Sequence, residues 1–203
     1  QKSKHCKTHR PRKLLFSDLN RSLDHSLIQS RAPDFSQPLE LLKACHEKIR
    51  FHLDLLIRLC EYLKTNTEDT EAYKTSRQVY RYFSSSAKLH HQDEDEDLFP
   101  VLLSKPDISA EARYLIIHLQ QEHTSLNEQW QTFENILLKN NLNRLPDMLE
   151  DALLLQKNYE QHIEHENRVV LPEAGKLLKE HEIKLLGRAM QSRRQQAPNP
   201  ENG

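Results

Sequence analysis

The fold is decided by two stretches of sequence, HHQDEDEDLFP at residues 90–100 and HIEHENRVVLP at residues 162–172. Each begins with a histidine, carries a glutamate four residues later and ends in a proline. A histidine and a glutamate at this spacing lie on one face of an α-helix, about one turn apart. The matched spacing therefore indicates an internal repeat of two helices that present the same pair of side chains.

The segment before each of these stretches holds one histidine on an otherwise apolar helical stripe. His46 precedes His90 by 44 residues, and His123 precedes His162 by 39 residues. The sequence therefore predicts two helical hairpins related by an approximate two-fold axis. The apolar neighbours on the two stripes are Leu42, Ile49, Leu53 and Leu56, and Ile116, Leu119, Leu126 and Trp130.

Composition also favours helices, because the 203 residues include only three glycines and are rich in Leu, Glu, Lys, Gln and Ala. Long helices with short connections predict an all-α, up-down antiparallel four-helix bundle, bent near Pro100. Residues 1–36 are polar, basic and interrupted by prolines, which predicts a flexible arm. The bundle is expected over residues 37–180, followed by a short helix and a disordered tail over residues 181–203.

Several polar side chains fall on inward stripes at one level, where they would be costly without partners. A metal centre satisfies imidazoles and carboxylates together, and the repeat predicts two ions, each with two imidazoles and with both carboxylates available as bridges. Iron suits these ligands; manganese is also found in such bundles, and ligand type alone does not exclude zinc, which usually closes a tetrahedral site. The predicted ligands are His46, His90, Glu94, His123, His162 and Glu166.

Other polar and aromatic residues near the predicted ligands are interpreted as having roles other than metal binding. His52, His91 and His165 lie off the stripes and are interpreted as surface or supporting residues. The acidic run at residues 93–97 is interpreted as a solvated helix face, apart from the predicted ligand within it. Tyr159 is close to one turn from a predicted ligand and is a candidate supporting residue. The alternative to a metal centre is a helical bundle that binds no metal.

Charge and cysteine content limit the classes of partner. The formal net charge is −1, which argues against nucleic-acid and anionic-membrane partners. The sequence has no run of eighteen apolar residues that would predict a membrane-spanning helix. It also has no apolar stretch after the basic start that would predict a secretory signal. The odd set of Cys6, Cys45 and Cys60 fits a reducing compartment, so a cytoplasmic protein is expected.

The sequence resembles the hemerythrin-like HHE cation-binding family over about residues 37–178. The resemblance rests on four ordered motifs: CHEKI around His46, HHQDEDEDLFP from His90, QQEH ending at His123, and HIEHENRVVLP from His162. It implies a di-iron four-helix bundle with an oxo or hydroxo bridge. Members include oxygen carriers, oxygen or iron sensors, and proteins of nitric-oxide handling and iron-sulfur repair.

One departure from the oxygen carriers guides the expected function. The carriers have a further histidine one turn from the histidine of the third helix, whereas here those positions are Leu119 and Asn127. The resemblance therefore implies binding of, or reaction with, dioxygen, peroxide or nitric oxide in redox or nitrosative stress. The alternative is a non-catalytic iron or oxygen sensing or storage protein that acts through a protein partner.

Overall fold

A computed structural model describes residues 32–197 of the chain. Every regular element in that range is a helix, which confirms the prediction of an all-helical protein. The arm predicted for residues 1–36 lies outside the described residues up to residue 31, and so does the end of the predicted tail. Within the described part, no helix is long and apolar enough to cross a membrane.

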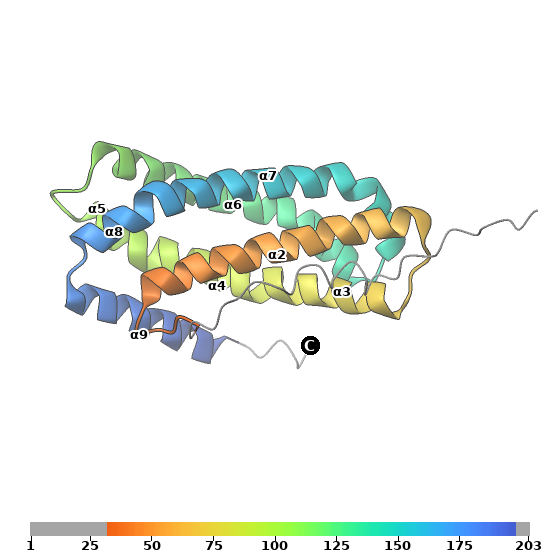
Figure 1. Cartoon of the computed structure of the whole chain (residues 1–203), viewed down its shortest axis with the longest axis horizontal. Helices are drawn as coiled ribbons and strands as arrows, with labels where there is room; N and C mark the ends of the chain where they lie inside the picture. Colours follow the sequence, from red (N-terminus) through yellow and green to blue (C-terminus); the bar gives the residue numbers. More distant parts are fainter. Residues whose placement is uncertain (1–31, 198–203) are drawn as a thin grey trace, which may run out of the picture. The chain divides into compact units, whose positions relative to one another are not determined.

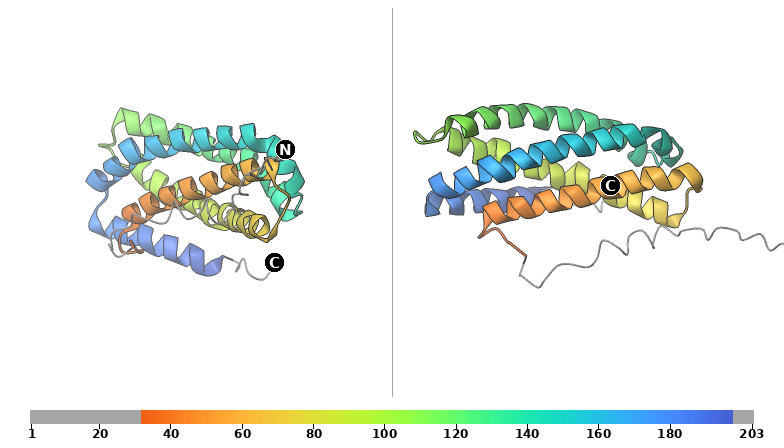
Figure 2. Two further views of the ribbon diagram at one scale, coloured as in Figure 1. Left: turned by 45° about the vertical axis from the view of Figure 1, so that its right-hand side comes forward. Right: turned by 45° about the horizontal axis from the view of Figure 1, so that its top comes forward.

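Four helical rods lie side by side within the described residues (Figures 1 and 2). Two rods are single helices, α2 (Pro38–Thr65) and α6 (Ala110–Leu138). The second rod combines α3 (Thr70–Arg81), η2 (Tyr82–Ala87), α4 (Lys88–Gln92), η3 (Asp93–Leu98) and α5 (Phe99–Leu103). A short η4 (Leu142–Met148) leads into the fourth rod, α7 (Leu149–His165), η5 (Glu166–Val170) and α8 (Leu171–Leu177), and α9 (Glu180–Gln196) follows.

Local sequence explains where the rods begin. Pro38 occupies the first turn of α2, where its missing amide hydrogen costs nothing. The Asp69 side chain accepts a hydrogen bond from the Ala72 amide at 2.8 Å and caps α3. The Ser109 hydroxyl accepts from the Ala112 amide at 3.2 Å and caps α6, at the break expected from the sequence.

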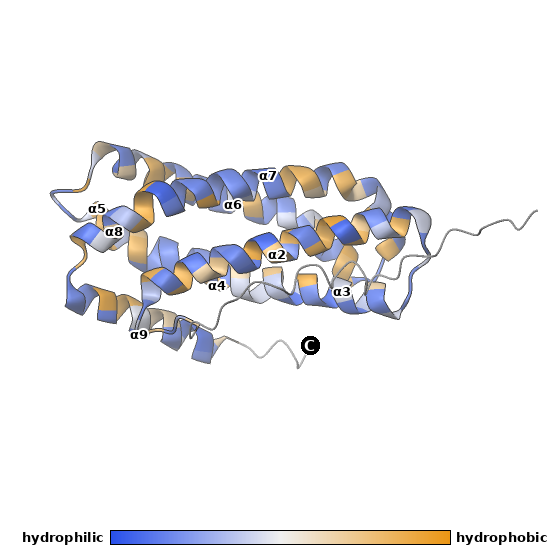
Figure 3. Cartoon of the chain, viewed as in Figure 1, coloured by the Kyte–Doolittle hydropathy of each residue, from blue (hydrophilic) through white to orange (hydrophobic). Residues whose placement is uncertain are grey.

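Apolar layers lie on both sides of the polar level. One cluster includes Leu42, Leu98 and Leu119, which are all buried. On the other side the rings of Phe83 and Trp130 pack with centroids 4.7 Å apart. Figure 3 shows hydrophilic and hydrophobic bands alternating along α2, as expected of a helix with one face in the core. These apolar layers therefore shield the buried polar side chains between them from water at both ends of the bundle.

Two wide helical turns, η3 and η5, occur at equivalent places in the repeat. The Phe99 amide donates to the Glu94 carbonyl and the Leu171 amide donates to the Glu166 carbonyl, five residues back instead of four. A proline follows each of these amides, at residues 100 and 172. Proline lacks an amide hydrogen and crowds the carbonyl four residues before it, so a wider turn relieves the clash. The helix therefore passes through both prolines.

The acidic run at residues 93–97 is not simply a solvated face, because α9 packs against it. Asp93 is fully buried and ion-pairs with Arg193 and, at 2.7 Å, with Arg194. Arg193 also pairs with Asp97 at 2.7 Å. The interpretation from sequence was wrong for these aspartates because periodicity within one helix carries no information about a later helix that covers it.

Glycine allows α9 to approach the start of the described chain closely. A Cβ added at Gly187 would lie 2.0 Å from the Phe35 carbonyl oxygen, far inside van der Waals contact. Arg194 lies over the Phe35 ring at 5.6 Å. The close packing of α9 against residue Phe35 therefore depends on the lack of a side chain at Gly187 as well as on the charge of Arg194.

Candidate metal centre

Six polar side chains from the four rods meet in the middle of the core. They are almost completely buried, and the largest exposed fraction among them is 5%, at the histidine from α6. Burial of so many ionisable groups in one place is costly unless they are compensated. The six are His46 from α2, His90 from α4, Glu94 from η3, His123 from α6, His162 from α7 and Glu166 from η5.

One half of the cluster is built around the first two histidines. The rings of His46 and His90 meet edge to face, with centroids 4.9 Å apart. His46 Nε2 lies 3.0 Å from Glu166 Oε2 and 3.9 Å from Glu94 Oε1. His90 Nε2 lies 3.6 Å from Glu94 Oε2. Two imidazole nitrogens in this half therefore face both carboxylates.

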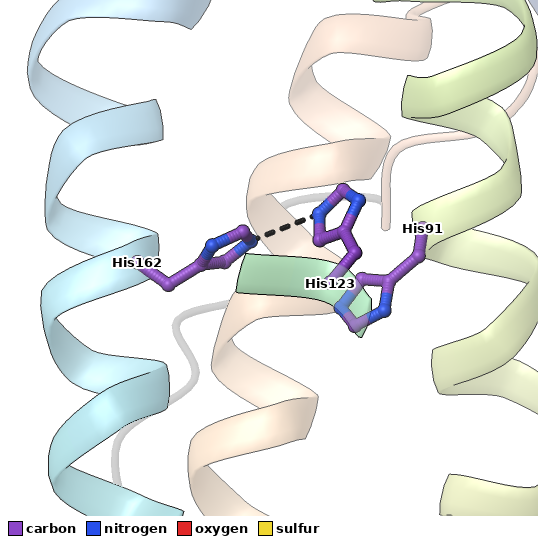
Figure 4. Close-up of side chains that lie close together, drawn as sticks. All are labelled: His91, His123 and His162. Atoms are coloured by element: carbon purple, nitrogen blue, oxygen red, sulfur yellow. Dashed lines mark hydrogen bonds between the residues drawn. The ribbon is translucent and has the colours of Figure 1, made fainter. Parts of the chain in front are cut away.

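The other half is built around the histidines of α6 and α7. Their Nε2 atoms, on His123 and His162, lie 3.1 Å apart (Figure 4). His162 Nε2 is 3.1 Å from Glu166 Oε1, and His123 Nε2 is 3.5 Å from Glu94 Oε2. The same two carboxylates thus face both halves, and each half forms a group of four side chains whose donor atoms lie within 4.8 Å of one another.

Hydrogen bonds at Nδ1 orient two of the histidines across the hairpins. His123 Nδ1 donates to Asp95 Oδ2 at 2.9 Å, and His46 Nδ1 donates to Asn167 Oδ1 at 2.9 Å. Asp95 and Asn167 each follow one of the buried glutamates, so the residue after each glutamate holds the single histidine of the opposite hairpin. The sequence contained this signal in the repeated Glu-Asp and Glu-Asn pairs, but it did not reveal which histidine each would reach.

A third histidine is held by a residue from a neighbouring rod. His162 Nδ1 donates to Glu122 Oε2 at 2.9 Å. A carboxylate only accepts hydrogen bonds, so Nδ1 carries a proton and Nε2 points into the cluster. His90 differs, because its Nδ1 is buried and has no hydrogen-bond partner within the described residues.

The protonation of the cluster reflects its buried carboxylates. Burial would lower the pKa of His46, but the carboxylates of Glu166 and Glu94 outweigh it and raise the pKa to about 10. For His162, the carboxylates of Glu166 and Glu122 likewise outweigh burial and raise the pKa to about 9. Burial, together with the charge of Glu166, raises the pKa of Glu94 to about 7. Without metal, the cluster therefore holds protons at neutral pH.

The donor set fits a cation better than it fits protons alone. Both carboxylate oxygens of Glu94 and of Glu166 are buried and lack hydrogen-bond partners among residues 32–197. His46 Nε2 is also without one, although it lies 3.0 Å from a carboxylate oxygen. Native proteins seldom leave buried polar atoms unsatisfied, and five such atoms in one cluster fit a site that binds a cation. Imidazole nitrogen and carboxylate oxygen are ligands for first-row transition metals.

Comparison with known proteins agrees with this geometry. The model of the hemerythrin HHE cation binding domain matches residues 37–174, which is more than half of the chain. The chain belongs to the hemerythrin family. An uncharacterized protein of Haemophilus influenzae is similar, with 31% identity over 96 residues, which cover 47% of this chain and 54% of that protein. The chain thus spans about half the length of that relative.

This hemerythrin domain places the remaining candidate residues at different distances from the cluster. Leu119, one of the two positions one turn from His123, is fully buried in the apolar layer. His118 is half-buried, and its Nδ1 lies within hydrogen-bond distance of the Tyr114 carbonyl oxygen, at 2.8 Å. His52 stacks on Tyr82, with ring centroids 3.8 Å apart. None of these three side chains belongs to the groups of close donor atoms found in the described residues.

His91 is closer to the hemerythrin cluster than its position off the stripe predicted. Its ring stacks on His123 at a centroid distance of 4.0 Å and lies 6.0 Å from the ring of Tyr159. The inward face of a helix is about 100° wide, so two consecutive residues can both border the core. His90 borders α2, and His91 borders α6 and α7.

Proposed function

We propose that this hemerythrin domain is a cytoplasmic, non-haem di-iron protein built on an up-down antiparallel four-helix bundle. The observation that carries the proposal is the pair of buried half-sites, each with two imidazoles, that share both carboxylates. The six predicted ligands would hold the ions, and Glu94 and Glu166 would bridge them. Manganese and zinc are the alternative metals, and an oxo or hydroxo bridge completes the expected centre.

The side chains around the centre prepare it for metal in three ways. Asn167, Asp95 and Glu122 fix three imidazoles with Nε2 facing inward. Such outer partners set the tautomer and strengthen the histidine as a ligand. Apolar layers on both sides keep bulk water away from the carboxylates, which strengthens their attraction for a cation.

The substrate class follows from burial. The least buried of the six side chains, His123, is only 5% exposed, so nothing larger than a few atoms reaches the donor atoms without opening the bundle. A bound iron pair would supply electron transfer and open coordination positions. Together with Leu119 and Asn127, which stand one turn from His123 where a further histidine would be expected in a carrier, this supports a role with dioxygen, peroxide or nitric oxide in redox or nitrosative stress.

Anaerobic iron loading followed by exposure to gas tests the proposal. The protein is titrated with ferrous iron, desalted, and exposed separately to dioxygen and to nitric oxide while optical spectra are recorded. We expect two irons per chain and new absorption bands after each exposure, with the His118→Ala variant unchanged as a control. Iron-loaded protein whose spectrum does not respond to either gas would contradict a small-molecule role.

A non-catalytic sensor or store is the second candidate, and the contact of α9 supports it. Arg193 and Arg194 bind the segment that carries Glu94, so a change at the centre has a direct route to α9. Counting turnovers separates the two functions. An enzyme consumes many equivalents of peroxide per centre, whereas a sensor consumes about one and changes the protease sensitivity of α9.

A further inference from the structure

The two halves of the cluster have the same inner donors. Each half consists of two imidazoles, and both halves include the carboxylates of Glu94 and Glu166. The oxygens of Glu166 reach the two halves equally, at 3.0 Å from His46 Nε2 and 3.1 Å from His162 Nε2. A difference between two bound ions would therefore come chiefly from groups beyond the six proposed ligands.

In the half built on α6 and α7, both imidazoles donate to carboxylates. His123 Nδ1 lies 2.9 Å from Asp95 Oδ2. His162 Nδ1 lies 2.9 Å from Glu122 Oε2. Both carboxylates are partly exposed, with 34% and 40% of their side chains accessible, and such groups are ionised at neutral pH. Two negative charges therefore lie behind this pair of imidazoles.

In the half built on α2 and α4, neither outer ring nitrogen bonds to a carboxylate of the described residues. His46 Nδ1 lies 2.9 Å from Oδ1 of Asn167, which is a neutral amide. His90 Nδ1 is buried and has no hydrogen-bond partner within residues 32–197. The buried carboxylate of Asp93, next to Glu94 in the chain, pairs with two arginines of α9. The two halves therefore differ by two negative charges at their outer ring nitrogens.

We propose that Asp95 and Glu122 make the two ions inequivalent, and that the ion on their side is the more easily oxidised. A carboxylate bonded to the outer nitrogen strengthens an imidazole as a ligand, and nearby negative charge favours the higher oxidation state of the metal. Ferricyanide that takes one electron from the ferrous pair, and is itself reduced by one electron, leaves the ferric ion in the half built on α6 and α7. This inference rests on the di-iron function proposed above.

Replacement by the matching amide separates the charge of an outer partner from its position. Asp95→Asn and Glu122→Gln keep an oxygen that can accept from the imidazole but remove the negative charge. Asn167→Asp does the reverse in the other half, because it adds a negative charge behind His46. Glu128→Gln removes a charge from an exposed position of α6 and serves as the control.

A redox titration of the iron-loaded protein with ferricyanide, followed by Mössbauer spectroscopy, measures the two potentials. We expect two one-electron steps in the parent protein, and two irons per chain in every variant at saturating iron. In Asp95→Asn and in Glu122→Gln the lower potential should rise by about 59 mV or more, which is a tenfold change in the oxidation equilibrium. In Asn167→Asp the upper potential should fall by a similar amount. Glu128→Gln should leave both potentials unchanged.

The outcomes separate this inference from the di-iron function. Potentials that stay unchanged in both amide variants and in Asn167→Asp, with two irons still bound, would overturn the inference and leave the di-iron centre in place. The same holds if the amide variants move the upper potential instead of the lower one, or if Glu128→Gln moves the potentials as far as they do. Fewer than two irons in the parent protein would instead overturn the di-iron function.

Discussion

At the scale of single residues, each hairpin holds a histidine of the other. Asp95 in the first hairpin bonds His123, and Asn167 in the second bonds His46. We therefore expect the six proposed ligands not to act as two separate sets, because loss of one outer partner should loosen a histidine of the opposite half. Glu122 is different, because it holds a histidine within its own hairpin.

Removal of the carboxylate at Asp95 tests this crossed arrangement. Asp95→Ala leaves Nδ1 of His123 without its acceptor, so the affinity for the second iron should fall by about 10–100-fold. Asp95→Asn keeps an oxygen that can accept and should restore much of the affinity. Competitive titration against a chelator measures both. Glu96→Ala, in the same acidic run but 56% exposed, should bind iron as the parent does.

The raised histidine pKa values predict opposite pH trends for metal-free and metal-loaded protein. The folded-state pKa values of about 10 for His46 and about 9 for His162 lie above the unfolded value of 6.5. Their contribution to stability is complete below pH 6.5 and is lost as the pH rises through 9 to 10. Iron must displace the same protons, so iron affinity should rise over that range.

Urea unfolding at pH 7 and pH 9.5, with and without iron, measures the two trends. The metal-free protein should be less stable at pH 9.5 than at pH 7. The stabilisation added by a fixed concentration of free iron should be larger at pH 9.5 than at pH 7. Metal-free stability that is level or rising over this interval is incompatible with protonated histidines in the cluster.

At the scale of elements, α9 packs against the segment that carries Glu94, one of the proposed ligands. Asp93 is fully buried beside Glu94, and its charge is met by Arg193 and Arg194 from α9. Burial nevertheless raises the pKa of Asp93, because these arginines only partly offset the loss of water. Loss of these arginines would therefore leave the buried carboxylate of Asp93 without a counter-charge.

Truncation of both arginines should destabilise the fold. The double variant Arg193→Ala, Arg194→Ala leaves Asp93 buried without a counter-charge, which costs about 3 kcal/mol or more. Equilibrium urea unfolding of the metal-free protein measures the difference. Lys184→Ala, which removes an exposed pair with Glu180 on the same helix, should change the unfolding free energy by less than about 1 kcal/mol. Equal effects of the two changes would show that α9 is held by its apolar residues.

Sequence periodicity predicts elements only as far as each helix keeps a constant angle per residue. It located the rods and the level of the six polar residues, because apolar steps of three and four residues surround them. It did not predict the wide turns at η3 and η5 or the placement of His91. The outer partners are also invisible to it, since Asn167 lies 121 residues from the histidine that it holds.

At the scale of the whole molecule, the cluster of six buried polar side chains joins all four rods. Glu94 and Glu166 share one buried site, and the charge of Glu166 helps to raise the pKa of Glu94. A ligand that binds only the folded state stabilises it in proportion to the logarithm of its concentration. Iron should therefore stabilise the entire bundle rather than one hairpin.

Thermal unfolding in the presence of iron tests this coupling. At a free iron concentration of about 100 times Kd the gain is about 2.7 kcal/mol. That corresponds to a rise in Tm of roughly 5–10 °C for a domain of this size. The transition should stay single in circular dichroism at 222 nm, and a strong chelator should reverse the shift. A biphasic transition would indicate that the two hairpins bind metal independently.

We propose that six residues form one centre for two ions, in two halves. Iron content per chain, measured after anaerobic loading and desalting, is the direct test of this proposal. We expect two irons in the parent protein and in His118→Ala, and at most one in His46→Ala and in His162→Ala. Two irons retained in both of the latter variants, or fewer than two in the parent, would contradict it.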